Sequence, residues 1–124
     1  MANAVNWFEM PVNDINRAKE FYAKVFDVEF FEREFFGTKM AFFPGDMDAP
    51  NISGALVQGE TYVPSKEGSM VYFHCPQDVN IQLERIRENG GTVINEKTDL
   101  GEDMGFIAHF IDTEGNRVGL HSMK

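Results

Sequence analysis

The chain has 124 residues, of which 43% are hydrophobic and 25% charged, and this length suits one globular domain or two small fused modules. Its formal net charge of −9 at pH 7 repels phosphate backbones, so we expect no nucleic-acid partner. No apolar run reaches the roughly 20 residues of a membrane span, and no signal peptide is visible at the N-terminus. A single cysteine, Cys75, suits a reducing compartment, so we expect a cytoplasmic protein without a membrane partner.

The sequence repeats itself once. Trp7-Phe8-Glu9-Met10-Pro11 is similar to Tyr72-Phe73-His74-Cys75-Pro76, and Asn51-Ile52-Ser53-Gly54 to Asn116-Arg117-Val118-Gly119, both at an offset of 65 residues. Between them, Met40-Ala41-Phe42-Phe43 is similar to Ile107-Ala108-His109-Phe110 at an offset of 67 residues. Three weak matches in the same order predict a single domain, residues 1–124, with modules over 4–58 and 69–122 and a connector over 59–68.

The first module reads as a strand, a helix and three strands. Alternating aromatic and polar residues predict a strand over residues 5–10. Asn13 or Asp14 can cap a helix that Asp27 ends, with an apolar face made by Ile15, Ala18, Tyr22, Val25 and Phe26. Turns at Gly37 and Pro44-Gly45 separate predicted strands over residues 28–33, 38–43 and 52–57.

The second module has the same order of elements. We expect a strand over residues 70–75, a helix from Asp78 to Gly90-Gly91, and strands over 92–96, 106–111 and 117–121. The fold class is therefore α+β, with two βαβββ modules. Because side chains alternate along a strand, one face meets the helices through Phe8, Met10, Val118 and Leu120. The other, inner face carries Trp7, Glu9, Gly119 and His121.

This pattern resembles the vicinal oxygen chelate superfamily, which includes glyoxalase I, bleomycin and fosfomycin resistance proteins, and extradiol dioxygenases. The segment from Trp7 to Asp14, followed by Arg17-Ala18 and Phe21-Tyr22, is similar to its first strand and helix. The run from Asp112 to His121 is similar to the signature before its last strand, and the glyoxalase-like subgroup is the nearest. The resemblance implies a glyoxalase-like fold whose curled mixed sheet surrounds a cavity for a small molecule, and a homodimer. It also implies a divalent metal held by His or Glu from the first and last strands of each module.

The positions that this resemblance assigns to the metal lack suitable side chains. They fall on Trp7 and Gly119, and the repeat carries them to Tyr72 and Gly54; a register one residue shorter replaces Tyr72 by Val71. A divalent ion needs carboxylate oxygens or imidazole nitrogens, which none of these residues offers. We therefore expect no cofactor at the usual positions, and the metal-dependent chemistry of the family is not transferred to this chain.

A cluster of polar residues lies two positions further along the same strands. Glu9 and His121 share the inner face with Trp7 and Gly119, His74 is the repeat partner of Glu9, and His109 lies on the preceding strand. These residues can line a ligand pocket, hold a displaced divalent metal through Glu9, His109 and His121, or pair structurally. A fourth interpretation makes Glu9 and His121 a catalytic acid–base pair.

Apolar residues share this inner face, and their role differs between the functional hypotheses. Trp7, Met40, Phe42 and Tyr72 can stack on a ligand or belong to the core. The first hypothesis is a module that binds a small hydrophobic molecule without a catalytic metal. The alternative is a lyase, isomerase or dioxygenase that uses Glu9 and His121, with or without a metal. A third option is a noncatalytic protein partner.

Overall fold

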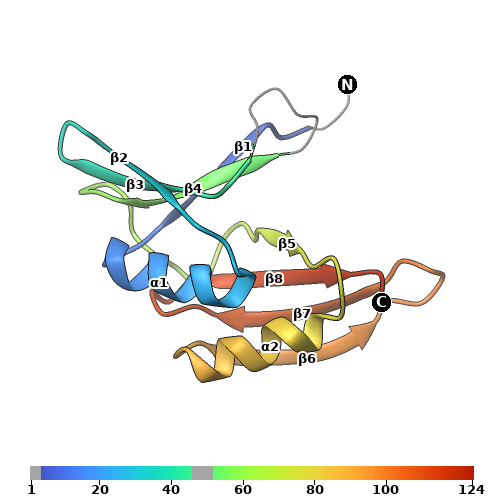
Figure 1. The fold of residues 1–124 in the computed structure, drawn as a ribbon. Helices are drawn as coiled ribbons and strands as arrows, with labels where there is room; N and C mark the ends of the chain where they lie inside the picture. The colour runs from blue at the N-terminus through green and yellow to red at the C-terminus, as the bar shows by residue number, and fades with distance from the viewer. Residues whose placement is uncertain (1–3, 46–51) are drawn as a thin grey trace.

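The predicted pair of βαβββ modules is confirmed by the computed structural model, which describes residues 4–45 and 52–124 (Figure 1). The elements of the first module are β1 (Trp7–Pro11), α1 (Ile15–Phe26), β2 (Phe31–Phe35), β3 (Thr38–Phe42) and β4 (Ser53–Gln58). The second module contains β5 (Tyr72–His74), α2 (Val79–Glu88), β6 (Thr92–Asp99), β7 (Phe106–Ile111) and β8 (Arg117–Ser122). Neither helix within this described part has the length and hydrophobicity that a membrane crossing requires.

The ends of α1 follow from two aspartates. The side chain of Asp14 accepts hydrogen bonds from the backbone N–H groups of Asn16 and Arg17, which have no partner within the helix. Asp27 adopts the left-handed conformation, with φ of 53°, and its N–H donates to the carbonyl of Ala23. Asp78 caps α2 in the same way, so both predicted helix starts are confirmed.

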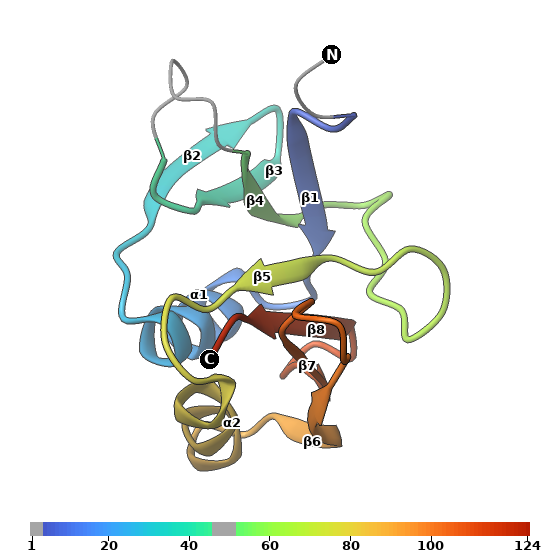
Figure 2. The same cartoon turned by 90° about the vertical axis from the view of Figure 1, so that its right-hand side faces the viewer.

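Each module builds one mixed four-stranded sheet. The strand orders are β1-β4-β3-β2 and β5-β8-β7-β6, so the two sheets have the same topology (Figure 2). The first and last strands of each module run parallel, and the other neighbours are antiparallel. The repeat in the sequence is therefore a repeat of the sheet.

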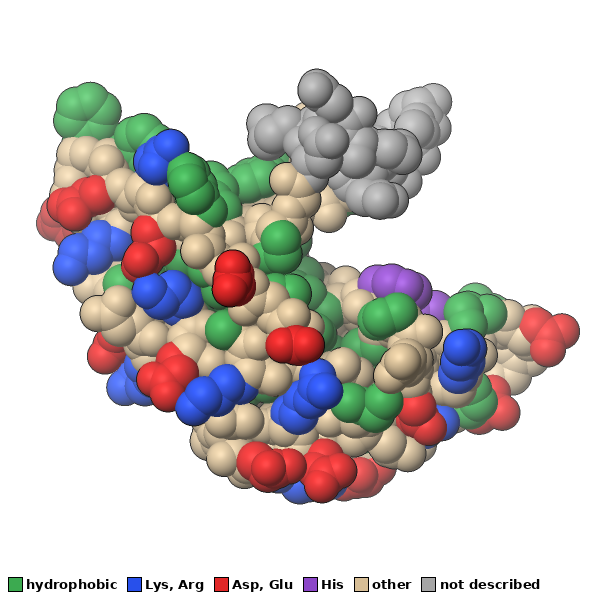
Figure 3. Space-filling model, viewed as in Figure 1, with side chains coloured by type: hydrophobic (Ala, Val, Ile, Leu, Met, Phe, Trp, Pro, Cys, Tyr) green, Lys and Arg blue, Asp and Glu red, His purple; other side chains and the backbone are tan. Residues whose placement is uncertain are grey.

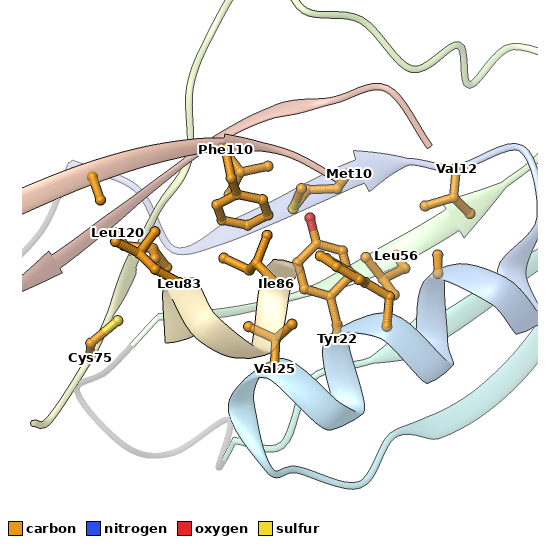
Figure 4. Packing of buried hydrophobic residues seen from close by; sticks show 14 of the residues in the cluster. Met10, Val12, Tyr22, Val25, Leu56, Cys75, Leu83, Ile86, Phe110 and Leu120 are labelled. Carbon is orange, nitrogen blue, oxygen red and sulfur yellow. The ribbon is translucent and has the colours of Figure 1, made fainter. Parts of the chain in front are cut away.

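Helix α1 lies between the two sheets, where it contributes to one core shared by both modules. It contacts β3 and β4 of the first sheet, while Phe21 and Tyr22 contact Phe110 of β7. The core includes Met10 and Leu56 from the first module and Leu83, Ile86 and Leu120 from the second (Figure 4). We call the sheet surface that meets this core the helix face and the opposite surface the open face. The two open faces lie outside the core.

A tight turn between β7 and β8 ties the modules together. Glu114 in this turn accepts hydrogen bonds from the backbone N–H groups of Asn13 and Asp14 and from the guanidinium of Arg17. Asp112, at the start of the turn, accepts a hydrogen bond of 2.6 Å from the hydroxyl of Tyr22. The run after Asp112 therefore holds the N-terminus of α1 against the second module.

Some strand boundaries differ from the predicted ones. The strand predicted from residue 28 begins only at Phe31, because Phe30 packs against the core before the ladder starts. β6 continues to Asp99, beyond the predicted end at residue 96, because irregularities in its pairing with β7 let the strand run on.

Candidate functional site

The open face of the first sheet carries four of the predicted inner-face residues. Trp7 and Glu9 lie opposite Ser53 and Ala55 of β4, and Met40 and Phe42 of β3 lie opposite Val57 and Ala55. The rings of Trp7 and Phe42 have centroids 5.8 Å apart, and the Phe31 ring of β2 lies 6.3 Å from that of Phe42. Phe31 is 55% exposed, so this aromatic surface is open to solvent in the single chain.

The open face of the second sheet carries the other four. Tyr72 and His74 of β5 lie opposite Gly119 and His121 of β8, and His109 of β7 lies opposite Gly119. His109 is buried, whereas Tyr72 and His74 are exposed. In Figure 3, histidine side chains gather on the surface of the second module near β5 and β8. The alternation of side chains thus brings the three histidines of the chain to one sheet surface, as the sequence predicts.

His109 joins two neighbours by short hydrogen bonds. Its Nε2 lies 2.6 Å from the hydroxyl of Tyr72, and its Nδ1 lies 2.6 Å from Nδ2 of Asn95 on β6. Burial, and to a smaller extent the positive charge of Arg117, lower the pKa of His109. Both effects favour the neutral imidazole, which its two hydrogen bonds hold in position from both sides.

Glu9 and His121 have separate partners. The carboxylate of Glu9 accepts a hydrogen bond of 3.0 Å from the hydroxyl of Tyr62 in the connector. Nε2 of His121 lies 2.8 Å from the carbonyl oxygen of Met104. The two residues belong to different sheets, and within residues 4–45 and 52–124 they share no hydrogen bond or ion pair with each other. A direct Glu9–His121 pair is thus not formed in the single chain.

The positions that the resemblance assigns to a metal hold aromatic rings or glycine. Tyr72, and not Val71, lies opposite Gly119, and Val71 instead packs against the core. In the first module the expected partner of Trp7 at Gly54 is wrong, because Ser53 lies opposite Trp7 and a β carbon on Gly54 would meet Phe8 on the helix face. In the described part of the chain, no group of three or more His, Cys, Asp or Glu residues is arranged to hold a metal ion.

A cleft of about 480 Å³ lies between the two modules. Its apolar lining comes from helix-face rings, including Phe8, Phe43 and Phe73, in place of the predicted Trp7, Phe42 and Tyr72. Of the predicted site residues, only His74 lines it. Apart from His74, the predicted site residues therefore lie on the sheet surfaces outside this cleft.

Asn95 and Tyr62 contact the predicted site residues and were not expected there. Strict alternation places Asn95 on the same face as Val93, which packs against the core. The pairing of β6 with β7 shifts between these two residues, and the shift turns Asn95 to the open face opposite His109. No pattern in the sequence marks that shift, and none marks Tyr62, which lies in the connector.

The sequence profile of the Glyoxalase/Bleomycin resistance protein/Dioxygenase superfamily matches residues 4–120, which is nearly the whole chain. The chain belongs to this superfamily. Its fold is similar to that of a superfamily domain from Frankia sp. EAN1pec, at 16% identity and a TM-score of 0.74, with 97% of each chain covered. It is also similar to the fosfomycin resistance protein FosX from Listeria monocytogenes, at 18% identity and a TM-score of 0.69, covering 98% of this chain and 94% of that one.

The superfamily fold occurs in larger chains as well. A glyoxalase I variant from Zea mays matches at 19% identity and a TM-score of 0.71, covering 95% of this chain and 46% of that one. A FosX variant was solved as a complex with manganese(II) and a dihydroxypropylphosphonic acid. At these identities the superfamily neighbours establish the fold alone, and the chemistry has to be argued from the residues of this chain.

Proposed function

We propose that this superfamily member binds a small organic molecule against the open faces of its sheets, without a metal at the usual positions. The observation that carries the proposal is the pair formed by Tyr72 and Gly119. The Tyr72 ring lies so close over Gly119 that a β carbon there would come within 2.5 Å of two ring carbons. An aromatic ring thus fills the space beside a position that the resemblance assigns to a metal ligand.

The donor groups at these positions do not fit a divalent ion. Trp7 has an indole ring, Gly119 has no side chain, and the hydroxyl of Tyr72 is hydrogen-bonded to His109. Zinc and similar ions select imidazole, thiolate and carboxylate groups, so the residues present are unsuited to hold one. They suit an organic ligand instead, because ligand sites combine apolar walls with a few placed polar groups.

We further propose that a second copy of the chain completes the site. The open faces lie outside the core, and the first of them exposes Phe31 and Phe35, which are 55% and 49% exposed. Figure 3 shows hydrophobic side chains along the β2–β3 hairpin at the edge of the molecule. Exposed contiguous apolar surface is typical of interaction sites. A homodimer that covers it would enclose the ligand near or across the interface.

An enzyme of the lyase, isomerase or dioxygenase type is the alternative. It requires Glu9 and His121 in one site, as ligand or base and as ligand or acid. Both residues lie on open faces, so a second copy can bring them together even though one chain does not. Their separate partners, Tyr62 and Met104, favour the binding function over this alternative.

Metal analysis and ligand binding separate the two functions. Protein purified without chelator is analysed for bound metals, and a fragment library is screened by NMR against the wild type, Glu9→Ala and His121→Ala. We expect less than one bound metal ion per protein chain. We also expect some fragments to perturb the resonances of open-face residues, and fragment binding to change little in either variant. A stoichiometric ion lost in both variants would establish the enzyme instead, and a screen in which no fragment perturbs either open face would refute the binding function.

A further inference from the structure

Tyr72, His109 and Asn95 form a continuous hydrogen-bonded chain across three strands. It runs from β5 through β7 to β6 on the second open face, with both donor–acceptor distances at 2.6 Å. His109 is 8% exposed, whereas Tyr72 at the other end is 47% exposed. The hydrogen-bonded chain therefore begins inside the sheet and ends at a side chain that is partly open to solvent.

The direction of this chain follows from its chemistry. The amide Nδ2 of Asn95 donates to Nδ1 of His109, so Nδ1 accepts and the hydrogen of the neutral ring is on Nε2. Nε2–H then donates to the oxygen of Tyr72. Because that oxygen already accepts, the phenolic hydrogen of Tyr72 is left for another acceptor. Hydrogen bonds in series polarise one another, which makes this hydroxyl a better donor than an isolated tyrosine.

Two features of the backbone allow the hydrogen bonds among Tyr72, His109 and Asn95 to form. At Gly119 the absence of a side chain gives the Tyr72 ring its room, since a β carbon would lie 2.5 Å from ring atoms Cδ2 and Cε2. At β6 the shift in pairing turns Asn95 toward His109. Two independent backbone features thus serve the same three side chains.

A positive charge lies on the same surface. Arg117 precedes Gly119 by two residues on β8, so it shares the open face, and its charge lowers the pKa of His109. The Nε atom of Arg117 is buried and has no hydrogen-bond partner within the described residues. Buried donors are normally satisfied, so this guanidinium has a hydrogen-bonding capacity that the described residues do not use.

We propose that Tyr72, supported by His109 and Asn95, together with Arg117, forms a binding site for the carboxylate of a small organic anion. This inference rests on the proposed function and adds its ligand class. The Tyr72 hydroxyl donates to one carboxylate oxygen, and the Arg117 guanidinium supplies the counter-charge. His109 and Asn95 are positioning residues that act through Tyr72.

The test uses benzoate as the probe and benzamide as its uncharged counterpart. Histidine ring ¹⁵N resonances of the full chain are recorded during titration, with the His109 signals assigned from His109→Gln. We expect ligand-free His109 to be neutral and protonated at Nε2, and benzoate but not benzamide to shift its resonances saturably. Tyr72→Phe, which keeps the ring over Gly119, should raise the Kd of benzoate at least about tenfold. Tyr62→Phe, which removes the hydroxyl bonded to Glu9, is the matched control and should leave the Kd unchanged.

Several outcomes overturn the proposal. A His109 ring protonated at Nδ1 would reverse the direction of these hydrogen bonds and leave the Tyr72 hydrogen directed at His109. Equal benzoate affinity in Tyr72→Phe and Tyr62→Phe, or no effect of benzoate on His109, would remove the anion site. If neutral fragments still perturb the open faces in those cases, the anion site alone fails and the proposed function stands. If no compound perturbs either face, both fail.

Discussion

Glu114 of the second module and Arg17 of the first form a two-point ion pair that joins the modules. Nε and Nη2 of Arg17 lie 2.7 and 2.9 Å from the two carboxylate oxygens of Glu114. The Glu114 side chain has no exposed surface, whereas the Arg17 side chain is half exposed. The same carboxylate also accepts the N–H groups of Asn13 and Asp14 ahead of α1. A single glutamate thus supports both a helix start and the contact between sheets.

We expect Glu114→Gln to destabilise the fold by about 1–3 kcal/mol, the usual cost of leaving buried hydrogen-bonding groups without suitable partners. The free energy of unfolding is measured by urea denaturation at pH 7. Glu20→Gln is the matched control, because Glu20 pairs with Lys24 on the exposed side of α1. We expect that control to unfold close to the wild type. Equal stability of Glu114→Gln and the wild type would show that the pair does not hold the modules together.

The stability difference between the wild type and Glu114→Gln should depend on pH. Burial raises the pKa of Glu114, but hydrogen bonds, above all from Arg17, outweigh burial and leave the pKa below its ordinary value of 4.5. The stabilisation by Glu114 is therefore fully present above pH 4.5 and is lost as the pH falls through the folded-state pKa. The stability difference between wild type and Glu114→Gln should shrink below pH 4.5; a difference that grows there would contradict this assignment.

The faces of the strands were predictable from the sequence, because alternation is a local property. It turns Trp7, Glu9, Tyr72, His109 and His121 to the strand faces opposite the helices, as observed. The distance between two sheets is not local, and for that reason the sequence could not decide whether Glu9 meets His121. In the single chain the two residues bond to other partners.

Register was predictable only to within one residue. In the first module the paired residues Trp7 and Ser53 are 46 residues apart in the sequence. In the second module the paired residues Tyr72 and Gly119 are 47 residues apart. A constant repeat offset cannot describe both modules, which is why the offset leads from Gly119 to Gly54 whereas Ser53 lies opposite Trp7. The turn of Asn95 to the open face has the same kind of origin, because an irregularity in β6 breaks the alternation that the prediction assumes.

The β2–β3 hairpin carries an unfavourable residue at its turn. Phe36 and Gly37 both have positive φ, 51° and 85°, between the paired residues Phe35 and Thr38. Two-residue loops of this kind favour Asn-Gly, whereas an aromatic side chain is disfavoured in the left-handed region. We expect Phe36→Asn to stabilise the protein by about 0.5–1.5 kcal/mol. Phe35→Asn, at a position without positive φ, is the control, and a gain in both variants would refute the turn explanation.

Cys75 should behave as an inert thiol. It is 1% exposed, and burial raises its pKa to about 11, so almost no thiolate exists at pH 8. We expect a disulfide reagent such as DTNB to modify the native protein at least about a hundredfold more slowly than the same chain in guanidinium chloride. The modification is followed by absorbance. Native and unfolded chains that react equally fast would place the thiol at an accessible surface.

The proposed dimer can be tested on the first open face. Phe31 lies there beside Phe42, and the guanidinium of Arg33 stacks 4.0 Å from the centroid of its ring. A glutamate at this position would replace apolar surface in the interface with a charged carboxylate, so Phe31→Glu should raise the dimer dissociation constant at least about tenfold. Val63→Glu introduces the same charge at a 73% exposed residue of the connector and should leave the assembly unchanged. Sedimentation velocity over a range of concentrations measures both, and a wild type that stays monomeric, or a Phe31→Glu variant that associates as the wild type does, would exclude this face as the interface.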